Sequence, residues 1–596
     1  MLCNCDPNMP SETLFPLLSS NGQAPSYRDV LSIYRRVLSA RIEEGTLRPL
    51  VLPYHLYGYL ILIVYLCIPH KNKPWVYALR WPVLLVVCSF QWKTIQETSS
   101  WNGAAAYAGG LVAALGIVWA FIWLVLYQPQ WDAQRVERRT KHGSDTIPKV
   151  AYGDTEELLD KRSKCRQAVP EYGFQEKYVK GGHSPQHIDQ EDKLPRKRRA
   201  VGGEPYGGVT YGSPISNGDL INSNVAAVAV ATDLTNQYEY FWQPYPDNIL
   251  ERTDWVWDLL ANFRGPGWNW EITPMPGQPL FIQQELGGPS GENFSSGKSS
   301  VGFRQFTSKH KLFDRQVPKF VAGYFVLDTL KILMMKDPYF IFGPNSYALP
   351  SHIAGLSTIQ LKVYRLIISF LAITISLEMA LILSPIGLGL VLGNSILGLR
   401  GEPWYYVTHW GSPSTIGTKG LNGLWGSWWH QTFRFAFAAP TNYLIDNQYI
   451  QPRSSSTKIV GLVFAFGISG FLHSCASMTQ FPKTSAINPM IFFMLQAVGI
   501  FIQSTACSLL SRYTERLPSW LRKGGNVLYA FGWLIMTAGW LTDDFARGGV
   551  WLYEPIPLSP LRGLGFGQFG DGWWCWDEYF IRWHKGKHWW ESGLAI

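Results

Sequence analysis

One stretch of the sequence constrains the fold more than any other. Ala104–Tyr127 reads AAAYAGGLVAALGIVWAFIWLVLY and contains no charged side chain. A helix of about 20 apolar residues is long enough to cross a hydrocarbon layer that is roughly 30 Å thick. The chain is therefore predicted to enter a membrane, where its backbone polar groups must bond to one another within helices.

Further apolar blocks lie on both sides of this stretch. They are Tyr54–Pro69, Trp75–Phe90, Val317–Met334, Leu361–Leu383, Ile386–Leu397, Ile459–Ala476, Met490–Leu510 and Val527–Leu541. The first two are short, which favours tilted or partly interfacial helices. Ile386–Leu397 is short and rich in glycine, which is typical of a re-entrant segment. We predict an all-α, polytopic integral membrane protein with about eight or nine membrane helices.

Composition agrees with a membrane protein. Aromatic residues make up 15% of the chain and charged residues 16%, against about 25% charged residues in typical soluble proteins. The net charge is +9, but the basic residues flank the apolar blocks, so we expect no nucleic-acid partner. The eight cysteines form no CxxC motif, and His584 and His588 lack a third ligand, so no metal site is predicted.

Polar and apolar stretches divide the chain into three regions. Residues 1–130 are predicted to hold about three membrane helices. Residues 131–250 are polar and are predicted to form a flexible loop or insert. Residues 251–596 hold the remaining apolar blocks and form the predicted core. The core includes the aromatic segment Arg252–Trp270 and the tryptophan-rich tail Gly563–Ile596, both of which we expect at the membrane interface.

Ionisable side chains within apolar blocks are few. Asp328 and Glu378 lie in such blocks, and pairing with neighbouring groups is the favoured interpretation for both. His473 lies in VGLVFAFGISGFLHSCA, among small residues that allow a helix or a substrate to approach closely. A buried neutral imidazole can accept a proton near neutral pH, as a general base must. The alternative is a structural histidine that donates to a backbone carbonyl.

A second cluster precedes His473. The sequence from Trp425 to Arg434 reads WGSWWHQTFR and also contains Trp428, Trp429 and His430. On a helix, His430 and Arg434 would share a face. Such a face could hold an anionic ligand against an aromatic wall, and the alternative is an interfacial belt of tryptophan and arginine.

Together the two clusters resemble a known family. The segment Leu424–Arg434, LWGSWWHQTFR, followed about forty residues later by SGFLH at Ser469–His473, resembles the wax synthase-like branch of the membrane-bound O-acyltransferase (MBOAT) superfamily. It is most similar to fungal members associated with terpenoid and meroterpenoid biosynthesis. Arg252–Trp270 and Glu554–Arg562 also look like those proteins. The resemblance covers roughly residues 240–590 and is weaker over the first 130.

The resemblance implies transfer of an acyl group from acyl-CoA to a hydroxyl inside a helical chamber. It implies His473 as the general base and His430, at a position that is often asparagine, as the residue that orients the acceptor or the thioester. We further expect Trp425, Trp429, Arg434 and Ser469 to bind substrate, with Arg434 or a nearby lysine or arginine in contact with the CoA phosphates.

The sequence departs from the family pattern in three places. Gly423–Trp429 lacks an acid and two arginines of the family motif, and Ser474 stands where the family has an acid. Residues 181–233 match nothing in the family and are either a lineage insert or a gene-model error.

The implied function is O-acetyl transfer from acetyl-CoA, as a co-substrate with no permanently bound cofactor, to a lipophilic alcohol in secondary metabolism. The expected partners are acyl-CoA, the alcohol and membrane lipid, and the expected location is the endoplasmic reticulum membrane. One alternative is a long-chain acyl-CoA:alcohol acyltransferase of the wax ester type. Another is a transporter with Asp328, Glu378 and His473 along its pathway, although the sequence contains no inverted repeat.

Overall fold

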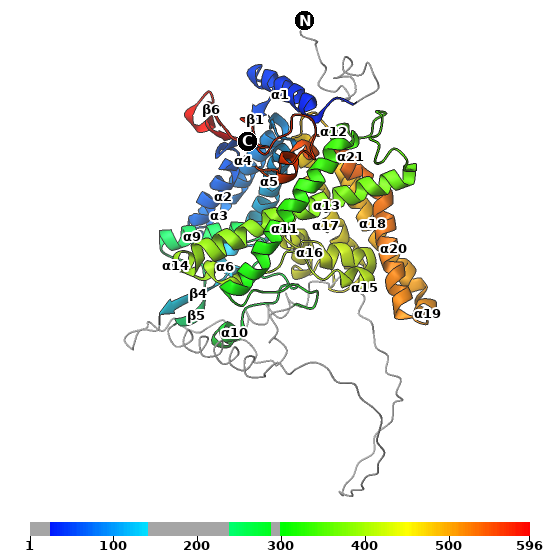
Figure 1. Ribbon diagram of the computed structural model, residues 1–596. Helices are drawn as coiled ribbons and strands as arrows, with labels where there is room; N and C mark the ends of the chain where they lie inside the picture. The colour runs from blue at the N-terminus through cyan, green and yellow to red at the C-terminus, as the bar shows by residue number, and fades with distance from the viewer. Residues whose placement is uncertain (1–23, 141–237, 288–298) are drawn as a thin grey trace, which may run out of the picture. The chain divides into compact units, whose positions relative to one another are not determined.

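The computed structural model describes residues 24–140, 238–287 and 299–596 (Figure 1). This part of the chain is mostly helical, as predicted, and also contains three small sheets. The elements that form the site belong to one compact unit, whose described residues are 24–138, 240–287 and 299–596. Most of the predicted insert at 131–250 lies outside the described residues.

Long helices carry the fold. They are α1 (Tyr27–Glu43), α2 (Tyr57–Cys67), α4 (Arg80–Glu97), α5 (Gly103–Phe121), α9 (Ile249–Ala261), α11 (Lys309–Lys336), α13 (Thr358–Ser384), α15 (Ser414–Gly423), α16 (Arg434–Asp446), α17 (Ser455–Met478), α18 (Ile487–Leu509), α20 (Ser519–Thr537) and α21 (Gly539–Arg547). The shorter α-helices are α3 (Pro74–Ala78), α6 (Pro129–Asp132), α10 (Leu280–Glu285), α12 (Tyr339–Phe342), α14 (Gly393–Leu397), α19 (Ser511–Thr514) and α22 (Pro560–Gly563).

The strands are short. They are β1 (Arg48–Pro49), β2 (Val51–Leu52), β3 (Thr98–Ser99), β4 (Arg135–Thr140), β5 (Tyr238–Gln243), β6 (Arg582–His584) and β7 (Gly593–Ala595). The end of the chain, β7, pairs antiparallel with both β2 and β6. This small sheet ties the C-terminal tail to the start of the helical region.

Four helical runs in the described part of the chain are long and apolar enough to span a membrane. They are Gly103–Leu126, Thr358–Gly401, Ser455–Met478 and Ile487–Leu509. The predicted blocks at these positions are therefore confirmed as apolar helices of spanning length. The larger total of eight or nine membrane helices remains a prediction.

The block Ile386–Leu397 is not one regular α-helix. A π-helical turn at Pro385–Leu392 continues α13, and the backbone then leaves the helical conformation at Gly393, where φ is 65°, before the short α14. The re-entrant insertion of this block remains a prediction. Proline has no backbone N–H and cannot complete the regular ladder, and a widened turn accommodates it. Helix α14 ends at Gly398, whose φ of 57° is a conformation that glycine adopts without a Cβ clash.

The two aromatic segments contain both buried and exposed rings, and their position at the membrane interface remains a prediction. Trp255 and Trp268 are fully buried and meet edge to face, with ring centroids 5.0 Å apart, in a cluster with α2 and α5. In the tail, Trp583 and Trp589 are exposed and lie on β6 and on a short 3₁₀ turn. Trp255 and Trp268 thus serve internal packing, whereas Trp257 of the same segment is exposed.

The two acids within apolar blocks are both paired, as predicted. Asp328 accepts hydrogen bonds from the Ser559 hydroxyl and from the backbone N–H of Leu561. Glu378 accepts a 2.7 Å hydrogen bond from the indole of Trp410 and lies 3.2 Å from His409 Nδ1. Each carboxylate therefore joins two segments of the fold.

A third buried acid should matter most for stability. Asp337 is fully buried and binds the Arg365 guanidinium through two hydrogen bonds of 2.7 Å. Asp337→Ala leaves that cation without its partner, which should destabilise the fold by about 3–5 kcal/mol. Thermal melting of the detergent-purified protein measures this. The control is Lys93→Ala, in an exposed pair that should contribute about 1 kcal/mol or less, and equal melting temperatures for the two variants would contradict the prediction.

Candidate active site

A large apolar cavity lies among the helices of the described chain. Its volume is about 1290 Å³, and α5, α11, α13, α17, α18 and α20 contribute to its wall. Small-molecule pockets usually have volumes of about 300–1,000 Å³. Most of the lining side chains are aliphatic or aromatic. The cavity, called the chamber below, can therefore hold a bulky lipophilic molecule.

All six residues predicted to be catalytic or substrate-binding line the chamber. They are Trp425, Trp429, His430, Arg434, Ser469 and His473. The two motifs meet because α16 packs against α17. Ser469 lies one helical turn before His473 on α17 and is largely buried. The structure thus brings both histidines to one enclosed space.

The His473 ring is held from two sides. Its Nδ1 lies 2.6 Å from the Tyr107 hydroxyl oxygen, and the ring stacks on Phe493 with centroids 4.6 Å apart. Within the described chain, Nε2 has no hydrogen-bond partner. That nitrogen is therefore free to meet a ligand in the chamber.

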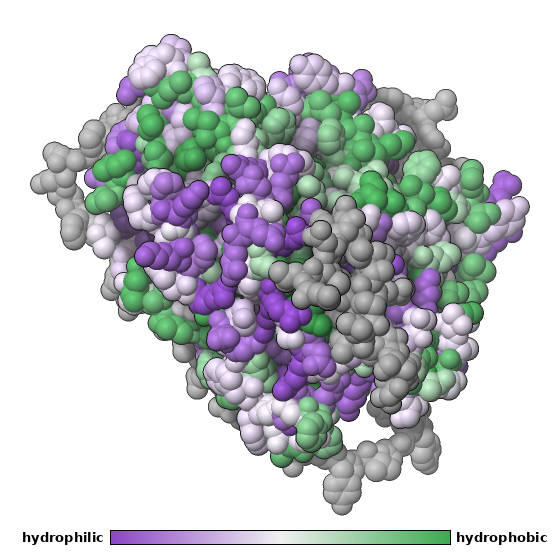
Figure 2. All heavy atoms as spheres, turned by 90° about the horizontal axis from the view of Figure 1, so that it is seen from above, coloured by the Kyte–Doolittle hydropathy of each residue, from purple (hydrophilic) through white to green (hydrophobic). Residues whose placement is uncertain are grey.

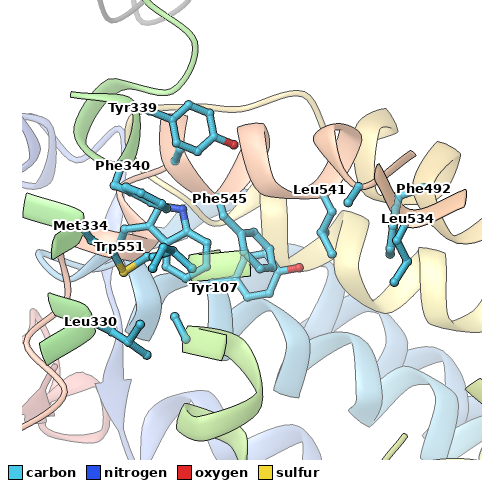
Figure 3. Packing of buried hydrophobic residues seen from close by; sticks show 14 of the residues in the cluster. Tyr107, Leu330, Met334, Tyr339, Phe340, Phe492, Leu534, Leu541, Phe545 and Trp551 are labelled. Carbon is cyan, nitrogen blue, oxygen red and sulfur yellow. The ribbon is translucent and has the colours of Figure 1, made fainter. Parts of the chain in front are cut away.

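Close packing of two helices explains how Tyr107 reaches this ring. A Cβ on Gly110, one turn after Tyr107, would lie 2.7 Å from the Cys475 carbonyl oxygen of α17. The Thr479 hydroxyl, at the end of α17, donates a 2.7 Å hydrogen bond to the Ala106 carbonyl of α5. Tyr107 also packs edge to face on Phe545, as Figure 3 shows, so its ring has little freedom to turn.

The predicted shared helical face of His430 and Arg434 is wrong. A π-helical turn covers Leu424–Trp428, the chain then becomes extended at Trp429, and α16 begins only at Arg434. The Gln431 side-chain amide donates to the carbonyls of Trp425 and Trp429, at 3.1 and 2.6 Å. These bonds satisfy carbonyls that the interrupted helix leaves unpaired.

His430 lies in an aromatic enclosure formed by Trp410, Trp429 and Phe433. Burial lowers the pKa of His430 to about 3, and the nearby His473 adds to the effect. The imidazole is therefore neutral near pH 7. Its buried Nδ1 has no hydrogen-bond partner in the described part of the chain. A neutral ring can orient a bound oxygen through one nitrogen without introducing a charge.

Arg434 is engaged with its own segment. Its Nη1 donates to the Gly426 carbonyl and to Gln431 Oε1, both at 2.8 Å. These bonds brace the turn that carries His430. Trp425 is fixed in a similar way, because its indole N–H donates to Gln496 at 3.3 Å.

Sequence reasoning missed Tyr107 and Phe493. Tyr107 is a hydroxyl-bearing residue within the apolar block Ala104–Tyr127, and polar groups at membrane depth are expected to have partners. That rule could have singled out Tyr107 but not its partner, because 366 residues separate it from His473.

Comparison with known proteins gives a match over the same region. Residues 407–495 match the model of the membrane bound O-acyl transferase family, and this range includes both histidines. No solved structure matches the chain.

Three curated relatives are fungal enzymes. The chain is 24% identical to the O-mevalon transferase macI of Penicillium terrestre over 48% of the chain and 60% of macI. It is 30% identical to the acetyltransferase spyB of Aspergillus fumigatus over 16% of each protein, and 22% identical to the acetyltransferase pyr8 of the same species over 53% of the chain and 70% of pyr8. The chain thus spans less than two thirds of the length of macI and spyB.

The family match and the apolar helices together indicate a membrane protein. They also agree with the resemblance carried by the two histidine motifs. The resemblance is confirmed by this match, in which residues 407–495 are similar to the membrane bound O-acyl transferase family.

Proposed function

We propose that this protein is a membrane-bound O-acyltransferase that moves an acetyl group from acetyl-CoA to a hydroxyl of a lipophilic terpenoid or meroterpenoid. The observation that carries the proposal is the single apolar chamber on which His430 and His473 both lie. The names of the relatives, acetyltransferases and O-mevalon transferases, support an acyl transfer in fungal secondary metabolism. We place the enzyme in the endoplasmic reticulum membrane.

The chamber suits the chemistry of an activated donor. A thioester already has a good leaving group, so ester formation needs mainly proximity, removal of one proton and exclusion of water. His473 Nε2 accepts the proton of the acceptor hydroxyl as its oxygen attacks the thioester carbonyl carbon. The carbon–sulfur bond then breaks, and the imidazolium returns the proton to the CoA sulfur. His430 holds the reacting oxygen.

This role requires one tautomer of His473. If Nδ1 carries the hydrogen, it donates to the Tyr107 oxygen at 2.6 Å and leaves the Nε2 lone pair free to act as a base. The opposite tautomer would present an N–H at Nε2 and could not accept a proton there. We assign the first tautomer, and Tyr107 is then a positioning residue.

The chamber volume also favours a second candidate. A cavity of about 1290 Å³ has room for a long acyl chain as well as an alcohol, which fits a wax ester synthase. The pairing of Asp328 and Glu378 within the fold gives no such support to the transporter alternative.

Donor and acceptor assays test both candidates. The purified protein is incubated with radiolabelled acetyl-CoA or palmitoyl-CoA and a panel of terpenoid and fatty alcohols, and esters are counted in the organic extract. We expect acetyl esters of terpenoid alcohols. Palmitoyl esters in excess would favour the wax ester type, and absence of any ester from a folded protein would refute acyl transfer.

A further inference from the structure

A second cavity has the opposite character to the chamber. Its volume is about 780 Å³, and it lies between α1 and the C-terminal tail. Helix α1 contributes Arg28, Arg35 and Arg36 to its wall, and Arg562 also lines it. Figure 2 looks onto the face that carries α1 and shows hydrophilic side chains gathered across its middle.

Aromatic rings complete the wall of this second cavity. Trp574, Trp576 and Tyr579 line it together with the arginines. The guanidinium of Arg35 lies 4.7 Å from the centre of the Tyr579 ring. Cations beside exposed ring faces suit a ligand that has both anionic groups and a flat ring.

The arginines differ in how firmly they are held. Arg28 pairs with Asp571, Arg562 with Glu554, and Arg35 with Asp577, whose side chain is 46% exposed. Arg36 is exposed, and it forms no ion pair in the described chain. Arg35 and Arg562 each keep a buried Nε–H without an acceptor. An incoming anion can therefore use Arg36 directly and can replace the solvated carboxylate of Asp577 on Arg35.

The second cavity adjoins the chamber. Trp576 lines both. A small cavity of about 20 Å³ lies at the same place, and its lining includes Arg35 from the polar side and Tyr553 and Phe580 from the chamber side. The rings of Trp576 and Phe580 stack with centroids 3.7 Å apart and form the partition. A thin, flexible chain crossing this partition would join the two spaces.

We propose that the second cavity binds the phosphorylated adenine nucleotide of the acyl-CoA donor. This inference rests on the proposed function, which requires a donor with a polyanionic head and a reactive thioester at the end of a long arm. Two cations that line the apolar chamber are already engaged, because Lys331 donates to the Trp551 carbonyl and Arg434 braces its own turn. The phosphates contact Arg36 and Arg35, the adenine lies against the tryptophan and tyrosine rings, and the arm passes Trp576 into the chamber.

Charge reversal at Arg36 tests this assignment in the purified full-length protein. A charge-assisted hydrogen bond to one phosphate corresponds to roughly a tenfold or larger change in affinity. Arg36→Glu should therefore weaken the binding of CoA, titrated without any acceptor, by about tenfold or more. The matched control is Arg512→Glu, which reverses another exposed arginine that lies outside the lining of both cavities.

A second readout compares two donors. S-acetyl-N-acetylcysteamine carries the same thioester without the nucleotide. The quantity compared is kcat/KM for acetyl-CoA divided by kcat/KM for the short donor. This ratio should fall about tenfold in Arg36→Glu. It should not change in Arg512→Glu. Unchanged CoA binding in Arg36→Glu, or equal weakening in both variants, overturns the site. A third outcome separates the two proposals. If CoA binding depends on Arg36 but the protein forms no ester, the nucleotide site stands and the proposed function is refuted.

Discussion

Replacing His473 by glutamine is expected to lower kcat for ester formation by about 10²–10⁴-fold, the usual contribution of a general base. Glutamine fills a similar space and keeps hydrogen-bonding groups, but it cannot take up a proton at neutral pH. The KM for acetyl-CoA should change little, because the donor head is assigned to a separate cavity. The measurement is steady-state acetyl transfer by detergent-purified protein, with melting temperature as the control for folding.

Tyr107→Phe should lower activity less than His473→Gln does. It removes the oxygen 2.6 Å from His473 Nδ1 and leaves the Phe545 contact in place. Loss of one hydrogen bond should lower kcat about tenfold with little change in KM. The matched control is Tyr59→Phe. The Tyr59 hydroxyl donates a 2.7 Å hydrogen bond to the Val112 carbonyl of α5, but Tyr59 does not line the chamber.

The two tyrosine variants separate positioning from stability. If Tyr107 acts only in packing, the melting temperatures of both variants should fall by similar amounts and kcat should stay unchanged. Wild-type turnover in a folded His473→Gln protein would remove His473 from the mechanism altogether. The chamber would then still bind a lipophilic molecule, but another group would have to take the proton.

The positions of the spanning helices followed from the sequence because membrane burial demands long apolar helices. Ala104–Tyr127 and Gly103–Leu126 differ by one residue at each end. The contacts within the aromatic segment Arg252–Trp270 were not predicted, because composition does not say whether a ring faces lipid or another ring. Trp255 and Trp268 pack on each other, and only tertiary structure specifies that contact.

The sequence predicted which residues form the candidate site, but not the backbone turns and contacts that hold them in place. The motif pair pointed to His430 and His473, yet the turn before α16 depends on Gln431 bonding two carbonyls of its own segment. The partnership of Tyr107 and His473 depends on close approach at Gly110, where α5 meets α17. Such contacts join parts of the chain that no local pattern connects.

Substitution of His430 is expected to cause the second large loss of activity. As the group that holds the reacting oxygen, it should contribute about as much as one donor of an oxyanion hole, so His430→Ala should lower kcat by roughly 10²–10³-fold. His430→Asn places an amide donor at the same point and should recover a substantial part of that loss. Asparagine cannot titrate, so this variant also tests the charge state of the histidine.

The pH dependence decides between a neutral and a charged role for His430. Burial lowers its pKa from 6.5 to about 3, so the proton is lost well below neutral pH and the ring is neutral throughout pH 5–9. The ratio of kcat/KM for His430→Asn to that for wild type should therefore be constant over this range. If His430 worked as an imidazolium with an ordinary pKa, wild-type activity would fall as pH rises through 6.5 and the ratio would climb. A flat ratio together with a deep loss in His430→Ala is what a neutral, orienting imidazole requires.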